Sequence, residues 1–435
     1  MLVFVSDLHF MDETAGHHNI PSDAFKKFLK SIKVHSDNTK NKNKEVKIVF
    51  LGDIFDLLRT EEWFKEKEED RPWGNNTKKM KMKKRARIIL EKIEKKNKET
   101  LNLLPKIELE KQFKDTQVEI IYIPGNHDRL CWMIDELKEK VIKLLDLNTS
   151  NKVNFKHYFC DLKYGVYASH GHEIDSFNYA GGSGYSNKDY KNTPIGDLIA
   201  TEIITKIPYE LIKKIESKKL LDEKEKNQLK KNFQEIDNIR PLKATLEWLF
   251  FQIKKNANLK KIIQDTIIDV MQGFDNLQYV KEYDKWHPFD TSDAVQCLSM
   301  VLQKIKLFSS ESLLNKLGYV FKVGGSIFEK IGSTNLIYNI VDKKHLNNIR
   351  YIVMGHTHVP LQEPLFYFNP ENKNMLKAIY FNTGTWRKTY YSYPCKEGIC
   401  FTERRNMNYV ILYTSKEKPN KSNLPVFETW IGREL

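Results

Sequence analysis

Five short motifs that combine aspartate, asparagine and histidine are spread along the chain of 435 residues. They are Asp7-Leu-His9, Gly52-Asp53-Ile-Phe-Asp56, Gly125-Asn126-His127-Asp128, His170-Gly-His172 and Gly355-His356-Thr-His358. Carboxylate, imidazole and amide side chains together suit borderline divalent metals such as Mn, Fe and Zn. The motifs therefore predict a site for two divalent metal ions.

The spacing inside the motifs indicates how these side chains would meet. Residues i and i+2 of an extended chain point to the same side, so Asp7 and His9 can enter one cleft together, as can His356 and His358. An aspartate can bridge two cations about 3.5–4 Å apart, because its charge offsets their mutual repulsion. The glycine that opens three of the motifs lets the backbone turn sharply toward the cleft.

The motifs follow strand-like runs, and helical patterns separate these runs in the first part of the chain. Strands are predicted at Leu2–Val5, Val46–Leu51, Val118–Ile123, Tyr351–Met354, Ala378–Asn382, Tyr409–Tyr413 and Val426–Trp430. Apolar residues recur at helical spacing at Phe25, Phe28, Leu29 and Ile32, and at Met82, Ala86, Ile89, Leu90 and Ile93. This alternation predicts an α/β fold whose ligands bind at the carboxyl ends of the strands.

Helical patterns dominate the middle of the chain, from about residue 192 to residue 348. An apolar stripe consists of Leu259, Ile262, Ile263, Ile267, Val270, Met271 and Phe274, and Ala244–Ile253 and Ala294–Ile305 have similar patterns. We therefore expect an α/β core formed by residues 1–175 and 349–435. A helical insertion at 176–348 would interrupt this core and form a cap or lid.

In this order, the five motifs resemble those of the calcineurin-like metallophosphoesterase family. The residues of these motifs are most similar to those of the branch that contains UDP-2,3-diacylglucosamine pyrophosphatase. The resemblance covers residues 1–175 and about 350–390. It implies a two-sheet β-sandwich flanked by helices, here with a large helical insertion.

The resemblance also implies roles for individual residues. One metal would be held by Asp7, His9 and His358, and the other by Asn126, His170 and His356, with Asp53 bridging both. A metal-bound hydroxide would attack the phosphorus atom, His127 would protonate the leaving oxygen as the general acid, and Asp128 would orient His127. The reaction would hydrolyse a phosphodiester, pyrophosphate or phosphomonoester. The same motifs occur in the family's nucleases, so a nuclease acting on DNA or RNA is the alternative.

Three further residues near the motifs have two interpretations each. Arg129 could hold a substrate phosphate or form a surface ion pair, and His172 could line the cleft or lie in an exposed loop. Asp56 could cap the following helix or support a ligand histidine.

The composition bears on partners and location. The formal net charge is +14, and much of the excess lies in residues 78–115, which could track a nucleic acid or form the solvated face of a helix. The five cysteines include no Cys-x-x-Cys pair, so we expect reduced thiols in a cytoplasmic protein. No run approaches the ~18 apolar residues of a membrane span, although insertion helices could touch a membrane surface. The sequence does not indicate an oligomeric state.

Overall fold

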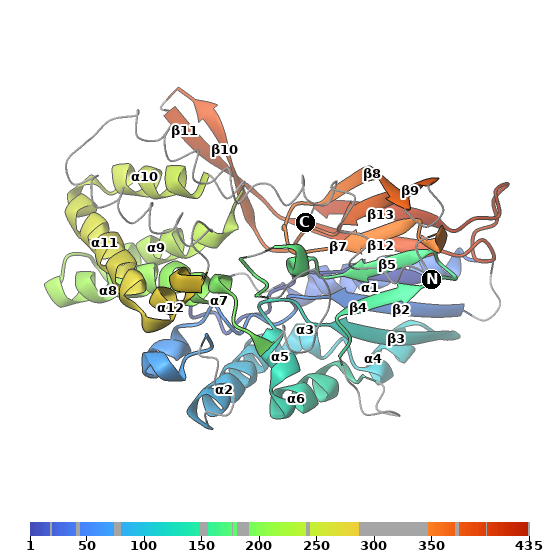
Figure 1. Ribbon diagram of the computed structural model, residues 1–435, viewed down its shortest axis with the longest axis horizontal. Helices are drawn as coiled ribbons and strands as arrows, with labels where there is room; N and C mark the ends of the chain where they lie inside the picture. The colour runs from blue at the N-terminus through green and yellow to red at the C-terminus, as the bar shows by residue number, and fades with distance from the viewer. Residues whose placement is uncertain are drawn as a thin grey trace.

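The protein is a mixed α/β structure with three β-sheets and a group of helices beside them (Figure 1). The computed structural model describes residues 1–17, 20–40, 44–73, 80–147, 155–175, 177–180, 191–240, 244–286, 347–369, 374–396 and 398–433. Within these ranges, no helix is long and apolar enough to cross a bilayer.

The first five-stranded sheet has the order β13-β12-β1-β2-β3. Its strands are β1 (Leu2–Val5), β2 (Lys44–Leu51), β3 (Thr116–Ile123), β12 (Asn406–Tyr413) and β13 (Val426–Arg433). The three N-terminal strands are parallel, whereas β12 runs antiparallel to β1 and β13 antiparallel to β12. The strands predicted from apolar runs in these regions are confirmed.

The second five-stranded sheet has the order β4-β5-β7-β9-β8. Its strands are β4 (Tyr158–Asp161), β5 (Val166–Ser169), β7 (Tyr351–Met354), β8 (Leu361–Asn369) and β9 (Asn374–Asn382). Strands β5, β7 and β9 are parallel to one another, and β4 and β8 run antiparallel at the edges. Residues far apart in the sequence therefore share one sheet.

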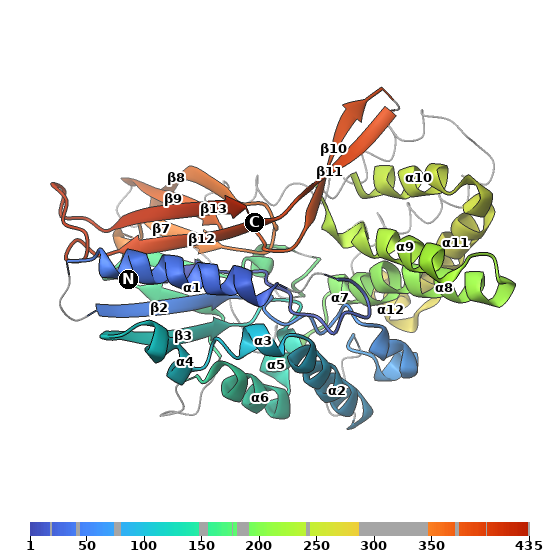
Figure 2. The same ribbon diagram turned by 180° about the vertical axis from the view of Figure 1, so that it is seen from behind.

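Alternating side chains of β1 show how the layers pack. Leu2 and Phe4 belong to an apolar core shared by the two five-stranded sheets, whereas Val3 and Val5 belong to a core shared with helices. The helices are α1 (Ser22–Asp37), α2 (Met80–Lys96), α3 (Lys98–Leu101), α4 (Lys106–Gln112), α5 (Arg129–Met133) and α6 (Asp135–Leu145). The apolar stripes predicted for α1 and α2 are buried in this second core, on the outer side of the first sheet (Figure 2).

The remaining helices form a separate apolar core beside the sheets (Figure 1). They are α7 (Ile195–Ile199), a π-helical turn (Ala200–Thr205), α8 (Lys206–Lys218), α9 (Glu223–Gln234), α10 (Thr245–Lys255), α11 (Lys260–Asn276) and α12 (Gln278–Trp286). Short 3₁₀ helices occur at Glu61–Lys65, Glu68–Asp70, His172–Ile174, Glu235–Asn238 and Ala257–Leu259. The predicted helix at Ala294–Ile305 lies outside the described residues.

A third sheet connects these helices with the C-terminal part of the chain. The two-residue strand β6 (Ile239–Arg240) pairs in parallel with β10 (Thr389–Cys395), which forms a hairpin with β11 (Gly398–Arg404). The pairing places Arg240 opposite Tyr391. No periodicity in the sequence predicts this two-residue strand.

The β10–β11 hairpin carries a disulfide between Cys395 and Cys400. The prediction that all five cysteines are reduced is therefore wrong for this pair, because the antiparallel hairpin brings the two residues together without a Cys-x-x-Cys motif. Cys131 and Cys160 form no disulfide with the described residues, and Cys297 lies outside those residues.

Candidate metal centre

The predicted ligands gather where parallel strands of both sheets end. Asp7 follows β1, Asp53 follows β2 and Asn126 follows β3, while His170 follows β5 and His356 follows β7. Carboxyl ends of parallel strands meet at one edge of a sheet, which is where ligands bind in α/β proteins. The packing of the two sheets brings both edges together.

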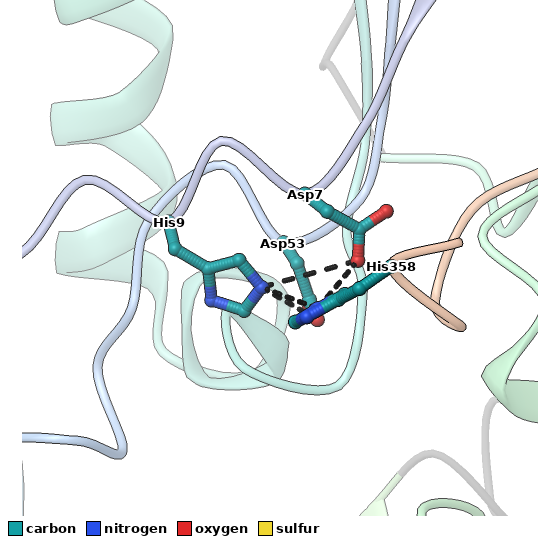
Figure 3. A group of neighbouring side chains, drawn as sticks. All are labelled: Asp7, His9, Asp53 and His358. Atoms are coloured by element: carbon teal, nitrogen blue, oxygen red, sulfur yellow. Dashed lines mark hydrogen bonds and ion pairs between the residues drawn. The ribbon is translucent and has the colours of Figure 1, made fainter. Parts of the chain in front are cut away.

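The first group consists of Asp7, His9, Asp53 and His358, all buried (Figure 3). Nε2 of His358 lies 3.2 Å from Oδ1 of Asp7 and 3.0 Å from Nε2 of His9. Oδ2 of Asp53 lies 3.7 Å from Nε2 of His9. Oδ1 of Asp7 has no hydrogen-bond partner among the described residues, whereas the other oxygen accepts from the backbone N–H of His356. Two oxygens and two nitrogens thus converge as a metal site requires.

The second group shares Asp53 with the first and adds His170 and His356. Oδ2 of Asp53 lies 3.2 Å from Nε2 of His170, and Oδ1 of Asn126 lies 3.2 Å from the same nitrogen. The amide nitrogen of Asn126 donates to Asn178, which leaves its oxygen directed at this group. Every ligand predicted from the sequence therefore lies at one of two adjoining positions.

The backbone reaches this arrangement through left-handed residues rather than through extended strands. The φ angles are 52° at Asp7, 46° at His9, 53° at Asp53, 71° at His356 and 61° at His358. The prediction that Asp7 and His9 share one side of a strand is thus wrong in its geometry, although the side chains do converge. Such conformations cost about 1–3 kcal/mol each in non-glycine residues and cluster at functional sites.

Close packing around Asp53 explains one of the glycines. A Cβ atom on Gly125 would collide with Oδ1 of Asp53 and would lie 2.6 Å from its backbone nitrogen. It would also lie 2.8 Å from the ring of His170. Only glycine lets the loop after β3 approach the shared carboxylate this closely.

Three of the four candidate ligand histidines are oriented by an acceptor behind the ring. Nδ1 of His9 lies 3.1 Å from Asp56, and Nδ1 of His170 donates to the backbone oxygen of Leu51 at 2.8 Å. Nε2 of His356 lies 2.8 Å from Asp175. An acceptor at one ring nitrogen places the proton there and leaves the other nitrogen free for a metal.

His358 differs from these three. The guanidinium of Arg240 donates to its Nδ1, and burial followed by the charge of Arg240 holds the pKa of His358 well below its usual value. The neutral ring therefore carries its proton on Nε2, 3.0 Å from His9. A metal at Nε2 needs the lone pair of that nitrogen, so the proton would have to move to Nδ1. Nδ1 could then no longer accept the hydrogen bond from Arg240.

The charges of Asp53 and His170 also fit a cation site. Burial opposes both charges, but Asp53 and Asp7 raise the pKa of His170 to about 10, and His170 and His127 hold the pKa of Asp53 well below its usual value. The carboxylate thus holds a proton on the neighbouring imidazole. A divalent ion would take the place of that proton, as metal binding to histidine does in general.

His127 lies at the edge of this centre. Its Nδ1 is 2.9 Å from Oδ1 of Asp56, and its backbone N–H donates to Asp53 at 2.8 Å. Burial alone would lower the pKa of His127, but the carboxylates of Asp56 and Asp53 raise it to about 9. The ring therefore carries a proton near neutral pH and can act as a general acid.

The carboxylate beside His127 differs from the one expected. Asp56, not Asp128, contacts its ring, whereas Asp128 accepts hydrogen bonds from the backbone of Gly125 and Ile54 and from Tyr122. Asp128 thus fixes the loop after β3. Asp56 supports the candidate ligand His9, whereas the following 3₁₀ helix is capped by the side chain of Thr60, so the interpretation of Asp56 as a helix cap is wrong.

The two predicted substrate contacts are both buried. Arg129 forms an ion pair at 2.6 Å with Asp197 of α7, so its charge is engaged inside the protein rather than on the surface. His172 is 1% exposed and packs between the rings of His170 and Tyr179, which excludes an exposed loop histidine. Substrate binding by Arg129 and His172 stays a prediction.

The sequence missed five residues in and around the centre. Asp175 orients His356, Arg240 contacts His358, and both Arg59 and Arg387 pair with Asp237. One signal could have found the arginines. The chain has only 11 arginines among its 71 basic residues, so each arginine is a candidate for a contact that lysine cannot make.

Comparisons with known proteins add no family to this geometry. No model of a known protein family matches the chain, and no curated protein matches it. What the residues themselves show is a buried set of histidine and aspartate side chains, centred on Asp53, that could hold a metal ion.

Proposed function

We propose that the protein is a phosphohydrolase that uses two divalent metal ions, with the architecture of a calcineurin-like metallophosphoesterase. The observation that carries this proposal is that two groups of buried ligands share Asp53. A shared carboxylate is a common means of holding two cations a few ångströms apart. The apolar core between the two five-stranded sheets supports the expected two-sheet sandwich.

Mn, Fe and Zn all suit the proposed ligands. One ion would be held by Asp7, His9 and His358, and the other by Asn126, His170 and His356, with Asp53 between them. When bound, such ions polarise a phosphoryl group and lower the pKa of water toward neutrality.

The protein's own contribution to bond cleavage would come from His127. Its ring is 12% exposed and charged near neutral pH, so it can give its proton to the leaving oxygen of a substrate at the centre. Asp56 holds the ring in place and keeps it protonated. This arrangement suits a phosphodiester, a diphosphate or a phosphomonoester.

A nuclease would use the same centre but is less well supported. In the described part of the basic segment, Arg85 and Lys92 of α2 form ion pairs with Glu62, and Arg87 pairs with Glu91. Charges neutralised in this way attract a nucleic acid backbone less strongly.

The test compares two diesters with Mn²⁺ added, bis-p-nitrophenyl phosphate and diphenyl phosphate. We expect wild-type turnover of both, and a His127→Ala loss of about 10²–10⁴-fold for diphenyl phosphate. The loss should be smaller for the p-nitrophenyl ester, because p-nitrophenolate leaves without a proton. His35→Ala, at a partly exposed histidine paired with Glu428, is the matched control.

Two results would contradict the proposal. One is the absence of turnover by wild-type protein that has been shown to contain metal. The other is an equal loss for both esters in His127→Ala, which would rule out proton donation by this ring.

A further inference from the structure

Three arginines from distant parts of the chain meet beside the metal centre. Arg59 follows β2, Arg240 lies in β6, and Arg387 lies between β9 and β10. All three surround Asp237, which is 2.9 Å from Arg59 and 3.1 Å from Arg387, while its backbone oxygen accepts from Arg240 at 2.8 Å. We call these three residues the arginine cluster.

The arginine cluster places three positive charges inside the protein. The carboxylate of Asp237 pairs directly with Arg59 and Arg387, whereas Asp56, Asp7 and Glu235 act on the cluster only at longer range. Arg59 and Arg387 are each 1% exposed and Arg240 is 6% exposed. Charges buried to this degree are costly unless they are paired and hydrogen-bonded. Three buried guanidinium groups at one place suit an anionic ligand.

Hydrogen bonding leads to the same conclusion. Among the described residues, the Nε atoms of all three arginines and one terminal nitrogen of Arg387 are buried without a partner. Buried polar groups in folded proteins nearly always have one. Planar guanidinium forks are the donors best matched to the oxygens of a phosphate.

The arginine cluster adjoins the side of the centre formed by His9, His127 and His358. Arg240 contacts the ring of His358 directly. The backbone N–H of Arg59 donates to Asp56, the carboxylate that contacts both His9 and His127. The side chain of Asp237 is 22% exposed, so solvent reaches the cluster.

Composition adds an independent argument. Only 11 of the 71 basic residues are arginines, and three of these 11 come together at this one place. A lysine supplies the same charge but not the two parallel donors. The cluster thus brings together three arginines in a chain whose basic residues are mostly lysines.

We propose that the arginine cluster binds phosphate oxygens of the substrate beyond those held at the metals. The inference rests on the proposed function and specifies its substrate class: phosphate compounds that carry more than the single charge of a simple diester. The extra oxygens can come from a phosphomonoester, whose reacting phosphate is itself a dianion, or from a second phosphate in a diphosphate.

The first experiment measures binding rather than catalysis. Inorganic phosphate and pyrophosphate are titrated by calorimetry into chelator-treated protein, so that neither metal nor turnover contributes. We expect wild-type binding of at least one anion, and roughly tenfold or weaker affinity in Arg387→Met, because a charge-assisted bidentate contact is lost. Arg87→Met, at an exposed arginine paired with Glu91, should bind as wild type does.

A conservative variant covers the case in which Arg387→Met does not fold. Arg387→Lys keeps the charge that faces Asp237 but lacks the fork, so its anion affinity should also fall. Absence of binding by the wild type at millimolar anion would overturn the proposal. So would unchanged affinity in a folded Arg387 variant, which would leave the cluster as a clamp between the helices and the sheets.

A kinetic comparison then distinguishes the two sources of the oxygens. With Mn²⁺, kcat/KM is measured for p-nitrophenyl phosphate, bis-p-nitrophenyl phosphate and a diphosphate diester. A loss in Arg387→Met confined to the monoester indicates contact with the reacting phosphate, and one confined to the diphosphate indicates a second phosphate. Equal losses for all three, including the simple diester, would overturn the assignment.

Failure of the proposed hydrolase function alone would abolish turnover yet leave the anion binding of the metal-free protein intact.

Discussion

The carboxylate of Asp56 lies 2.9 Å from Nδ1 of His127. Its other oxygen lies 3.1 Å from Nδ1 of His9. One buried carboxylate thus contacts both the candidate proton donor and a candidate metal ligand. Burial opposes its charge, but His127 and His9 hold the pKa of Asp56 well below its usual value, so it remains ionised.

This relationship predicts a pH effect for Asp56→Asn. The general acid must be protonated, so activity falls as the pH rises through the pKa of His127, which the carboxylates of Asp56 and Asp53 raise from 6.5 to about 9. Removing the charge of Asp56 lowers that pKa, and the alkaline limb of kcat/KM for diphenyl phosphate should move to lower pH. Asp128→Asn should leave the limb in place, because Asp128 contacts Tyr122 and the backbone instead. The reverse pattern would restore the role that the sequence predicted for Asp128.

Asp53→Asn tests the sharing of one carboxylate between two metals. Outer-shell partners of metal ligands are worth about 10–100-fold in affinity, so loss of the bridging charge should weaken metal binding by at least that factor. We expect wild-type protein to retain two equivalents of Mn²⁺ after dialysis, and Asp53→Asn to lose at least one together with its activity. The control is Asp135→Asn, at a carboxylate that is 89% exposed. Two retained equivalents and full activity in Asp53→Asn would contradict the assignment.

Local periodicity predicted seven strands of the two five-stranded sheets, and the resemblance to the metallophosphoesterase family implied the ligand set. The strand and helix patterns depend on local periodicity, which a short window such as Leu2–Val5 already contains. Asp7, Asp53 and His356 follow closely after predicted strands, whereas β5, which precedes His170, is not among the predicted ranges. The elements that share a sheet edge could thus be inferred before any distance was known.

Other features could not be predicted because they depend on long-range pairing. Arg240 approaches His358 only because β6 pairs with β10, and a two-residue strand has no periodicity to detect. The partner of His127 depends on how the loops after β2 and β3 meet, and the resemblance implied Asp128 rather than Asp56. The disulfide between Cys395 and Cys400 likewise depends on a hairpin that was not foreseen.

Gly125→Ala tests the close approach of the loop to Asp53. The added methyl would collide with Oδ1 of Asp53 and lie 2.8 Å from the ring of His170, so we expect loss of metal binding together with a lower melting temperature. Gly273→Ala is the matched control, since nothing lies within 4 Å of its Cβ position in α11. There alanine should raise the free energy of unfolding by up to about 1 kcal/mol. Normal metal stoichiometry in Gly125→Ala would show that the loop has room to move.

Arg129→Met separates a structural role from substrate binding. Arg129 and Asp197 are 4% and 1% exposed, and their ion pair joins the helix after the Gly-Asn-His-Asp motif to the first of the helices beside the sheets. Removing one partner of a buried pair leaves the other uncompensated, which costs about 3–5 kcal/mol. We expect a loss of this size in denaturant unfolding of the full chain, with KM changed little.

The double variant Arg129→Met, Asp197→Leu makes this test specific. Replacing both charges by apolar side chains removes the uncompensated carboxylate, so much of the lost stability should return. If Arg129 instead held a substrate phosphate, the single variant would raise KM by about tenfold or more while unfolding changed little, since a charge-assisted hydrogen bond is worth about 1.5–3 kcal/mol. The one-to-one pairing of Arg129 with Asp197 favours the structural outcome, because each charge of this pair is balanced by the other, whereas Arg59 and Arg387 share the carboxylate of Asp237.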